Sequence, residues 1–567
     1  MKNSTISHPY KIDPQYKKPV AYFSMEYAIH QPLKIYASGL GYIAGSYLRS
    51  AFSLKQNVVG VGILWKNGFY DQVRKNDQTM EVLFHEKQYH FLQETNINFS
   101  VKINDKDVKV TAYYLPPEIF NTAPLYLLST DLPENDFWSE SITSKLYESN
   151  IELRTAAKIL LGIGGLNLLE AMRHEPEVYH LNNADALPLA FFLLNKYKNI
   201  EEVKKRIVYT NSCLDEALVD KSGLYFLEKM NYFNGASFNV IKDITRSKSD
   251  SFDPNLAAHS FARISNGLSV AHTNLIKQNQ KLDAQLNPTV NITIGQNFKY
   301  WEDTILYKAL KDQKDNVLVK RKKANKKKLF EEIAEQTGKI FDENILTLVW
   351  ARTFTSDRRP DLILQDNERF QQIISNKTFP IQLIFAGKPH PMDYAAVSSF
   401  DKLINSSKHH INFAVLVGHE LKLAKLLKGG ADLWLNTQRV NYEATETSGI
   451  SAAMNGSINL STPDGWINEF CKNGNNSFIV SHDDHEHSLN EEEKEDINNL
   501  FDMLEKTIIP MYYNEPSQWL EIMKNSMRDI IPYFDSDRMV KEYYEKLYNY
   551  DPEKVVHNPT LKSLIAL

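Results

Sequence analysis

This sequence of 567 residues has little of what defines several large classes of protein. It contains two cysteines, Cys213 and Cys471, and no CxxC pair. A disulfide scaffold and a cysteine-rich zinc site are therefore excluded, and a reducing compartment is expected. No stretch approaches about 18 consecutive apolar residues, so we expect no transmembrane helix and no membrane partner. Residues 1–13 also lack the apolar core of a signal peptide, which favours a cytoplasmic location.

The chain also lacks a strong charge of one sign. Its 65 basic and 70 acidic residues give a formal net charge of −5, so nothing favours a nucleic-acid partner. The hydrophobic content of 43% is that of an ordinary globular protein. The sixteen histidines show no metal-binding spacing, and we expect no metal site. A chain of this length suits two or three domains.

Short apolar runs rich in β-branched and aromatic residues alternate with helical patterns along the chain. Such runs are typical of strands buried on both faces of a parallel sheet. Residues 150–173 carry a helical apolar stripe, and residues 420–428 form a short predicted helix that ends at Gly429 and Gly430. The alternation predicts an α/β protein with doubly wound sheets. The predicted strands are 19–23, 57–65, 177–182 and 206–211 in a first series and 344–351, 381–387, 411–418 and 431–436 in a second.

A basic run over residues 320–328 lies between the two series of strands. Clustered lysines can indicate nucleic-acid binding, but Glu331 and Glu332 follow at once. This pattern favours a solvated helix between two domains. Two α/β domains joined there would leave a ligand-binding cleft at the carboxyl ends of their strands.

A glycine-containing loop, Ser38-Gly39-Leu40-Gly41, separates a predicted strand from a helix that begins near Ile43. Glycine lets the backbone approach a ligand closely, and amides at the start of a helix favour an anion such as phosphate. By itself the loop is interpreted equally well as a tight turn without a ligand.

Several further motifs give this loop its context. Residues 21–27 precede it, and residues 59–72 follow it with the pattern Val-Gly-Val-Gly-Ile-Leu-Trp. In this order the motifs resemble those of the α-glucan phosphorylases, in particular the bacterial short form, from about residue 19 to residue 549. The later motifs are Val178-Tyr179-His180-Leu181-Asn182, Phe385-Ala386-Gly387-Lys388-Pro389-His390-Pro391, Asp432-Leu433-Trp434-Leu435-Asn436, Thr447-Ser448-Gly449, Asp464-Gly465-Trp466 and Phe534-Asp535-Ser536-Asp537-Arg538.

The resemblance implies the GT-B fold, in which two Rossmann-like doubly wound domains face a central cleft. It implies a first, glucan-side domain over 1–310, a connecting helical segment over 311–342 and a second, phosphate- and cofactor-side domain over 343–530. The C-terminal helix, over 531–567, is then expected to return to the first domain. An α-1,4-glucan or another sugar is the implied ligand, and a homodimer is the implied assembly.

The resemblance also implies pyridoxal phosphate, which the family anchors on a lysine in the helix after Thr-Ser-Gly. That position is Ser451 in this sequence, and no lysine lies between Lys428 and Lys472. A Schiff base requires a primary amine, which a hydroxyl cannot replace. We therefore expect no covalently bound cofactor.

The remaining site residues are assigned by the same resemblance. The phosphate or donor side comprises Gly39, Leu40, Gly41, Arg352, Arg358 and Arg359, and the sugar side comprises Asn182, Glu443 and Ala444. Four more positions depart from the family pattern besides Ser451. Asp185 and Ser212 stand where the family has histidines, Thr353 stands for a phosphate-contacting arginine, and Glu446 adds a carboxylate near the expected phosphate.

Three functions stay open at this point. The first is a noncatalytic homologue that binds a glucan or a partner protein, with phosphorolysis altered or lost. The second is a glycosyltransferase that uses a nucleotide-sugar donor and no pyridoxal phosphate. Retaining GT-B transferases often carry two glutamates separated by seven residues; counted from Glu443, the second position is Ser451, so this motif is absent. The third is an active α-1,4-glucan phosphorylase that releases glucose 1-phosphate.

Overall fold

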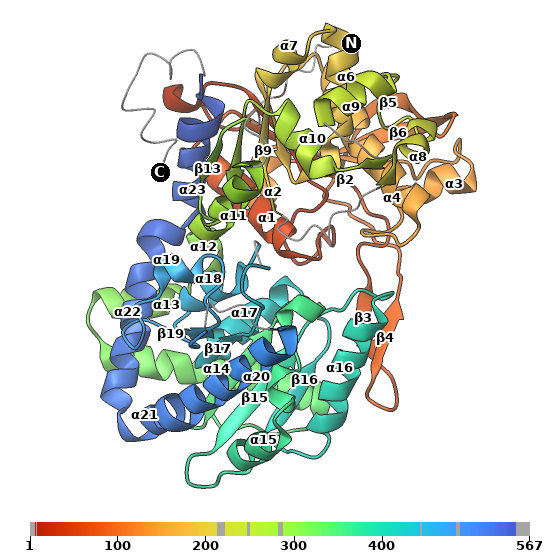
Figure 1. Ribbon diagram of the computed structural model, residues 1–567. Coiled ribbons are helices and arrows are strands. Elements are labelled where there is room, and N and C mark those ends of the chain that lie inside the picture. Colours follow the sequence, from red (N-terminus) through yellow and green to blue (C-terminus); the bar gives the residue numbers. More distant parts are fainter. Residues whose placement is uncertain are drawn as a thin grey trace. The chain divides into compact units, whose positions relative to one another are not determined.

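The computed structural model describes residue 6 and residues 8–212, 222–245, 250–281, 287–442, 445–482 and 488–551. The chain divides into two compact units (Figure 1). Unit 1 comprises Met1–Tyr70, Phe84–Gly295 and Ser536–Leu567, and unit 2 comprises Asp71–Leu83 and Gln296–Asp535. The division therefore follows Gly295 rather than residue 310, and the expected connecting segment 311–342 belongs to unit 2.

Unit 1 is built on a nine-stranded sheet in the order β13-β12-β9-β8-β1-β2-β7-β6-β5. The strands from β13 to β7 pair in parallel, while β7, β6 and β5 pair antiparallel. The first predicted series is confirmed, since its four runs are β1, β2, β8 and β9. The strands are β1 Val20–Phe23, β2 Val58–Ile63, β5 Gln93–Ile103, β6 Lys106–Leu115, β7 Leu125–Ser129, β8 Val178–Asn182, β9 Ile207–Thr210, β12 Ile264–Gly267 and β13 Thr289–Asn291, with a separate pair β10 Ser222–Gly223 and β11 Ser251–Phe252.

Helices cover the sheet of unit 1. The predicted helix over residues 150–173 is confirmed as α4, a π-helical turn η2 and α5 in direct succession. Its glycines allow a close approach to the sheet, because a Cβ on Gly165 would lie 2.5 Å from Cε1 of Phe23. The helices are α1 Gly39–Ser53, α2 Pro117–Phe120, α3 Phe137–Ser141, α4 Ile151–Ile159, η2 Leu160–Gly164, α5 Gly165–Ala171, α6 Pro188–Tyr197, α7 Ile200–Lys204, α8 Leu224–Lys229, α9 Phe238–Thr245, α10 Pro254–Phe261, α11 Val270–Lys281, α23 Ser536–Glu542 and η8 Tyr543–Tyr548, with short 3₁₀ turns η1 Pro14–Tyr16 and η3 Ala184–Ala186.

The last helices of the chain are part of the core of unit 1. The hydroxyl of Tyr548 lies 2.7 Å from Nδ1 of His180 on β8 and 2.7 Å from the hydroxyl of Tyr47 on α1. The second ring nitrogen of His180 lies 2.7 Å from Oγ1 of Thr210. All of these side chains are buried, and burial lowers the pKa of His180 to about 3. His180 is therefore a neutral structural residue, and its hydrogen bond with Tyr548 links η8 to the sheet.

Unit 2 contains a six-stranded parallel sheet in the order β16-β15-β14-β17-β18-β19. The second predicted series is confirmed as β14, β15, β16 and β17, and the predicted helix 420–428 is confirmed as α17. The strands are β14 Leu346–Ala351, β15 Ile381–Ala386, β16 Phe413–Leu416, β17 Leu433–Asn436, β18 Ile458–Ser461 and β19 Phe478–Ile479, with a separate hairpin β3 Asp71–Arg74 and β4 Met80–Leu83. The helices are α12 Phe298–Trp301, α13 Thr304–Lys311, α14 Asp315–Thr337, η5 Ser356–Arg358, η6 Leu362–Leu364, α15 Asn367–Ile374, α16 Tyr394–Ser407, α17 Leu421–Gly430, α18 Ser448–Ala453, α19 Ile467–Phe470, α20 Leu489–Met503, η7 Leu504–Ile508, α21 Ile509–Asn514 and α22 Pro516–Phe534.

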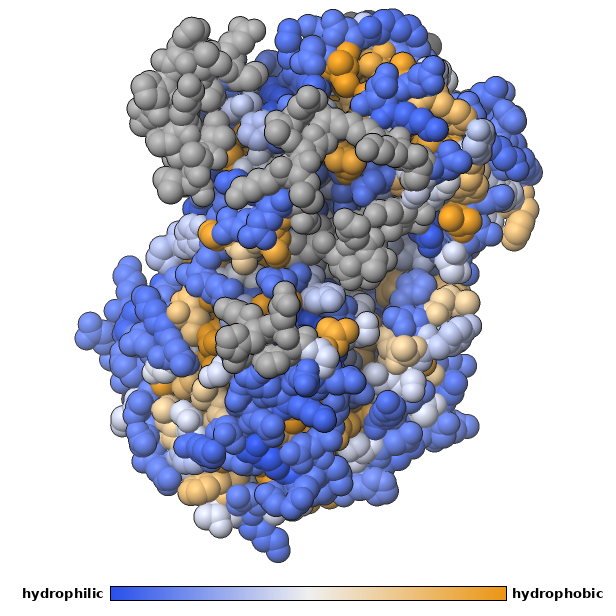
Figure 2. All heavy atoms as spheres, in the orientation of Figure 1, coloured by the Kyte–Doolittle hydropathy of each residue, from blue (hydrophilic) through white to orange (hydrophobic). Residues whose placement is uncertain are grey.

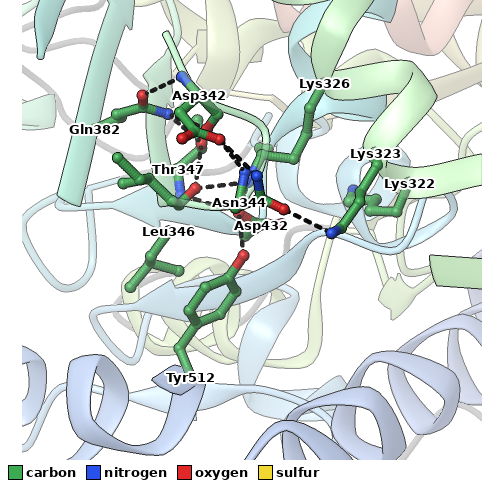
Figure 3. Close-up of polar contacts among 12 residues, drawn as sticks. Lys322, Lys323, Lys326, Asp342, Asn344, Leu346, Thr347, Gln382, Asp432 and Tyr512 are labelled. Carbon is green, nitrogen blue, oxygen red and sulfur yellow. Dashed lines mark hydrogen bonds and ion pairs between the residues drawn. The ribbon is translucent and has the colours of Figure 1, made fainter. Parts of the chain in front are cut away.

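The basic helix α14 is not the solvated connector that its composition favours. Lys326 is 1% exposed, and its ammonium donates to Oδ2 of Asp432 at 2.6 Å and to the carbonyl of Ile345 at 2.6 Å. The same carboxylate accepts from the backbone amide of Thr347 at 2.9 Å (Figure 3). Lys322 is also buried and donates to the carbonyl of Asn455. The prediction of a solvated helix was wrong because Lys322 and Lys326 face inward and bond to groups next to β14, β17 and β18.

Among the helices in the described part of the chain, none is long and apolar enough to cross a bilayer. The face shown in Figure 2 is largely hydrophilic, with hydrophobic areas that are small and scattered.

Candidate functional site

The glycine-containing loop of unit 1 surrounds a buried carboxylate. Glu26 follows β1 and accepts from the backbone amides of Ala37 at 2.6 Å and Ser38 at 2.8 Å. The hydroxyls of Ser38 and Tyr147 also donate to it. Burial raises the pKa of Glu26, and these hydrogen bonds oppose that shift. A Cβ on Gly41 would lie 2.9 Å from the Glu26 carboxylate, so glycine is needed there for this internal contact.

The loop amides expected to hold a phosphate consequently have partners within the protein. The amide of Leu40 donates to the hydroxyl of Ser38 at 3.2 Å, which caps α1, and the amide of Gly41 donates to the carbonyl of Ser38 at 3.1 Å. Gly39 is the first residue of α1. The local negative charge at this helix start is supplied by Glu26 rather than by a ligand.

Asn182, one of the predicted sugar-side residues, lies at the carboxyl end of β8 and contacts the segment that follows β1. Asn182 donates to the hydroxyl of Ser24 at 3.1 Å, and that hydroxyl donates to the carbonyl of Glu26 at 3.0 Å. Asp185 lies 3.9 Å from the ammonium of Lys158, and both side chains are 15% exposed. Ser212 is half-buried two residues beyond β9.

Two asparagine oxygens in this group stand out. Oδ1 of Asn182 and Oδ1 of Asn183 are buried, and neither has a hydrogen-bond partner among the described residues. Asn183 also adopts φ 69° and ψ 171°, a conformation that side-chain-bearing residues rarely adopt. Unmet acceptors and backbone strain of this kind concentrate at binding sites.

In unit 2, the loop that follows β14 carries the three arginines of the predicted phosphate side. Arg352 is buried and donates to Oε1 of Gln438 at 2.6 Å. Arg359 donates to the carbonyls of Thr437 and Gln438 at 2.8 and 3.0 Å. Arg358 is half-buried and donates to the carbonyl of Thr353 at 3.3 Å. These contacts join the loop after β14 to the loop after β17.

Arg359 belongs to a buried ion-pair group rather than to an open anion site. Its Nη2 lies 2.6 Å from Oδ2 of Asp496, which is fully buried. His482 lies 3.2 Å from the other oxygen of Asp496, and Glu492 completes a group whose possible metal-ligating atoms lie within 4.8 Å. Arg439 lies 3.8 Å from Glu492. Because guanidinium groups already neutralise both carboxylates, we interpret the group as a structural network.

Glu446 occupies the start of α18, where the resemblance expects a phosphate. It is 4% exposed and accepts from the amide of Gly449 at 2.9 Å, from the hydroxyl of Ser448 and from Nε1 of Trp466. Ser451 is fully buried, and its hydroxyl donates to the carbonyls of Thr447 and Ser448 at 3.1 and 3.2 Å. Both side chains therefore satisfy groups of α18 itself. Glu443 and Ala444 lie outside the described residues.

A buried lysine lies close to this region. Lys428 on α17 is 2% exposed, and its ammonium lies 3.6 Å from the ring centroid of Trp301. Burial lowers the pKa of Lys428 to about 7, and the charge of Glu446 opposes this shift. Lys428 is the last of three lysines in the predicted helix 420–428, and nothing in the helical pattern indicated that its ammonium would be enclosed.

The structure thus brings the predicted residues together in two groups, one in each unit. Gly39, Leu40, Gly41, Asn182 and Asp185 lie at the carboxyl ends of β1 and β8, while Arg352, Arg358, Arg359, Glu446 and Ser451 surround the carboxyl ends of β14 and β17. Sequence reasoning missed Glu26, Tyr147, Gln438 and the Trp466 contact. For Glu26 a signal exists, since a carboxylate directly after a buried strand falls at the ligand-binding edge of a parallel sheet.

Comparison with known proteins agrees with the order of the motifs. A family model described as carbohydrate phosphorylase matches residues 242–502. Maltodextrin phosphorylase of Thermococcus litoralis is 29% identical over 94% of this chain and 71% of its own length, and glycogen phosphorylase of Aquifex aeolicus is 28% identical over 95% and 87%. An uncharacterized protein of Methanocaldococcus jannaschii is 38% identical over 94% of this chain and 100% of its own length. The chain therefore belongs to the carbohydrate phosphorylase family, as a divergent member.

Proposed function

We propose that this chain is a phosphorylase homologue that binds an α-glucan without pyridoxal phosphate-dependent phosphorolysis. The observation that carries the proposal is the position of Glu446, a buried carboxylate held by three donors at the start of α18. A second negative group at the same place, such as the phosphate of a cofactor, would be repelled by the Glu446 carboxylate.

The residues present do not fit pyridoxal phosphate. An anchoring amine is absent at Ser451, whose hydroxyl is turned into its own helix. The donors of Ser448 and Gly449, which would suit a phosphate, are used by Glu446. Together these contacts support a protein that folds and functions without the cofactor.

Glucan binding is supported by the group at the carboxyl end of β8. A sugar presents many hydroxyl donors, and the oxygens of Asn182 and Asn183 are acceptors without partners among the described residues. Asp185 can accept a further hydroxyl and Lys158 can donate to one. Because the relatives are named maltodextrin and glycogen phosphorylase, we propose that the bound sugar is an α-glucan.

We further propose the GT-B architecture for the chain as a whole. It is supported by family membership and by the parallel sheet with covering helices in each unit. A homodimer and a cytoplasmic location are proposed on the same family grounds.

A transferase that uses a nucleotide-sugar donor has less support. Such a donor would need amides at the start of α1 and the free charge of the arginines, yet Leu40 and Gly41 have internal partners and Arg359 is paired with Asp496. Arg352 and Arg358 are likewise engaged with the loops around them.

The test uses the full-length protein and maltoheptaose. We expect saturable binding in isothermal titration calorimetry, no release of glucose 1-phosphate with added phosphate, and no absorption band after incubation with pyridoxal phosphate and gel filtration. Replacing Asp185 by asparagine removes the charge that pairs with Lys158 and should weaken maltoheptaose binding on the order of tenfold.

Glu134→Gln is the matched control, because Glu134 is an exposed carboxylate of the same unit and should leave the affinity unchanged. Release of glucose 1-phosphate would refute the loss of phosphorolysis. Failure to bind maltoheptaose, or equal affinities for both variants, would refute the glucan site.

A further inference from the structure

A pocket lies within unit 2, between α14, α17 and the residues that follow α18. It has a volume of about 340 Å³ and is bounded by residues 300–304, one face of α14 and the last turns of α17. Gly429, near the end of α17, and Asn455, just beyond α18, form part of its lining. A volume near the lower end of ligand pockets suits a molecule of the size of a sugar phosphate.

The basic run of the sequence supplies one wall of this pocket. Arg321, Asn325 and Lys328 are spaced by four and three residues on α14, which places them on the same face of the helix. Lys322 and Lys326 point into the core instead. The run is thus divided between structural lysines and residues that face the pocket.

The positively charged side chains that line the pocket can donate hydrogen bonds to a ligand. Arg321 uses Nε for an ion pair with Asp303 at 2.8 Å, and within the described ranges its two terminal nitrogens have no partner. Lys328 is exposed and forms no ion pair in the described part of the chain. On the opposite wall, Lys425 lies over the ring of Tyr300 at 3.6 Å, and both residues line the pocket. Three positive side chains therefore converge from two helices.

The acidic groups of the pocket do not cancel this charge. Asp303 already accepts four hydrogen bonds, from the amides of Ile305 and Leu306 at the start of α13 and from the side chains of Arg321 and Asn325. Glu302 is the other carboxyl group, and burial together with the charge of Asp303 raises its pKa. The lining has three positive side chains, Arg321, Lys328 and Lys425, against these two carboxyl groups, so positive charge is in excess.

Two buried lysines add to the positive potential behind the pocket. Lys322 donates to the carbonyl of Asn455 at 3.0 Å, and Lys428 lies against Trp301; both Asn455 and Trp301 line the pocket. Burial and a neighbouring lysine lower the pKa of each to about 7. An anion in the pocket would offset the repulsion among these ammonium groups.

We propose that this pocket binds a small organic phosphate. The phosphate lies among Arg321, Lys328 and Lys425, where an arginine fork and two ammonium groups can bond its oxygens. The side-chain oxygens of Asn325 and Asn455 accept from hydroxyl groups of the organic part. The site is a second ligand site, distinct from the groups at the carboxyl ends of the strands.

The experiment titrates the full-length protein with ribose 5-phosphate at fixed ionic strength in a calorimeter. Inorganic phosphate and ribose are titrated separately, so that the contributions of the two halves are distinguished. We expect ribose 5-phosphate to bind more tightly than inorganic phosphate and ribose not to bind. Lys328→Glu and Lys425→Glu should each weaken ribose 5-phosphate binding about tenfold or more.

Lys320→Glu provides the matched control, because Lys320 is exposed on the same helix, changes the net charge equally and does not line the pocket. It should leave the affinity within about twofold of the original protein. Absence of ribose 5-phosphate binding up to about 10 mM, or an equal loss in all three variants, would overturn the proposal. Inorganic phosphate binding as tightly as ribose 5-phosphate would overturn the organic part of it.

Discussion

Replacement of Glu446 by alanine is the most direct test of the carboxylate at the start of α18. The change leaves the amide of Gly449 and Nε1 of Trp466 without an acceptor in a buried region, at about 1–3 kcal/mol for each group. The hydroxyl of Ser448 keeps the hydrogen bond that it accepts from Nε1 of Trp434 at 3.3 Å and loses only the acceptor of its own proton. Removing a buried charge recovers part of this loss, so we expect a net destabilisation of about 3 kcal/mol.

Urea titration followed by tryptophan fluorescence measures the loss, and hydrogen exchange of a peptide over residues 445–456 locates it. Glu446→Gln keeps one acceptor oxygen and should lose about half as much. Glu335→Ala, an exposed carboxylate of α14, should change the free energy of unfolding by less than about 0.5 kcal/mol. A loss below about 1 kcal/mol for Glu446→Ala, with unchanged exchange at residues 445–456, would refute the reasoning.

Three further predictions concern other buried groups. Lys326→Met leaves the buried charge of Asp432 without its main partner and should cost about 3–5 kcal/mol in a urea titration, whereas exposed Lys323→Met should cost less than about 0.5 kcal/mol; similar losses would contradict the burial of Lys326. Because the folded pKa of Lys428 is about 7 against 10.5, the unfolded chain binds more protons between these values, so Lys428 makes the free energy of unfolding rise with pH across that window. Lys428→Met should therefore show a smaller rise than the original protein between about pH 7 and 9, and an unchanged rise would exclude the shift. Asn183→Gly relieves a backbone strain of about 1–3 kcal/mol and should raise the melting temperature while weakening maltoheptaose binding. An unchanged affinity for maltoheptaose would show that Asn183 does not bind the sugar.

The strands were predictable because each is a short apolar run buried on both faces. The β14 run, for example, is buried at all six positions, and its hydrophobic pattern is independent of distant partners. Helix α17 was predictable in the same way, since its end is marked by two glycines.

The chemistry of the sites was less predictable, because it depends on pairs far apart in sequence. Composition places a lysine at the surface, and only the fold shows that Lys326 meets Asp432, 106 residues away. The glycines at the start of α1 suggested a ligand, but the group that lies close to Gly41 is the Glu26 carboxylate, which follows β1. Glu446 was recognised as a departure from the family, while its partner Trp466 became apparent only from the structure.

The division of the chain has a consequence for its synthesis. The chain passes between the units after Tyr70, after Leu83, after Gly295 and after Asp535, so neither unit is one continuous segment. Tyr548, whose hydroxyl contacts His180 and Tyr47, leaves the ribosome only after every segment of unit 2. The core of unit 1 therefore stays incomplete until the segment after Asp535 is made, at a time when every segment of unit 2 is already present. Expression of residues 1–535 would reproduce this state, and such a fragment should depend on chaperones.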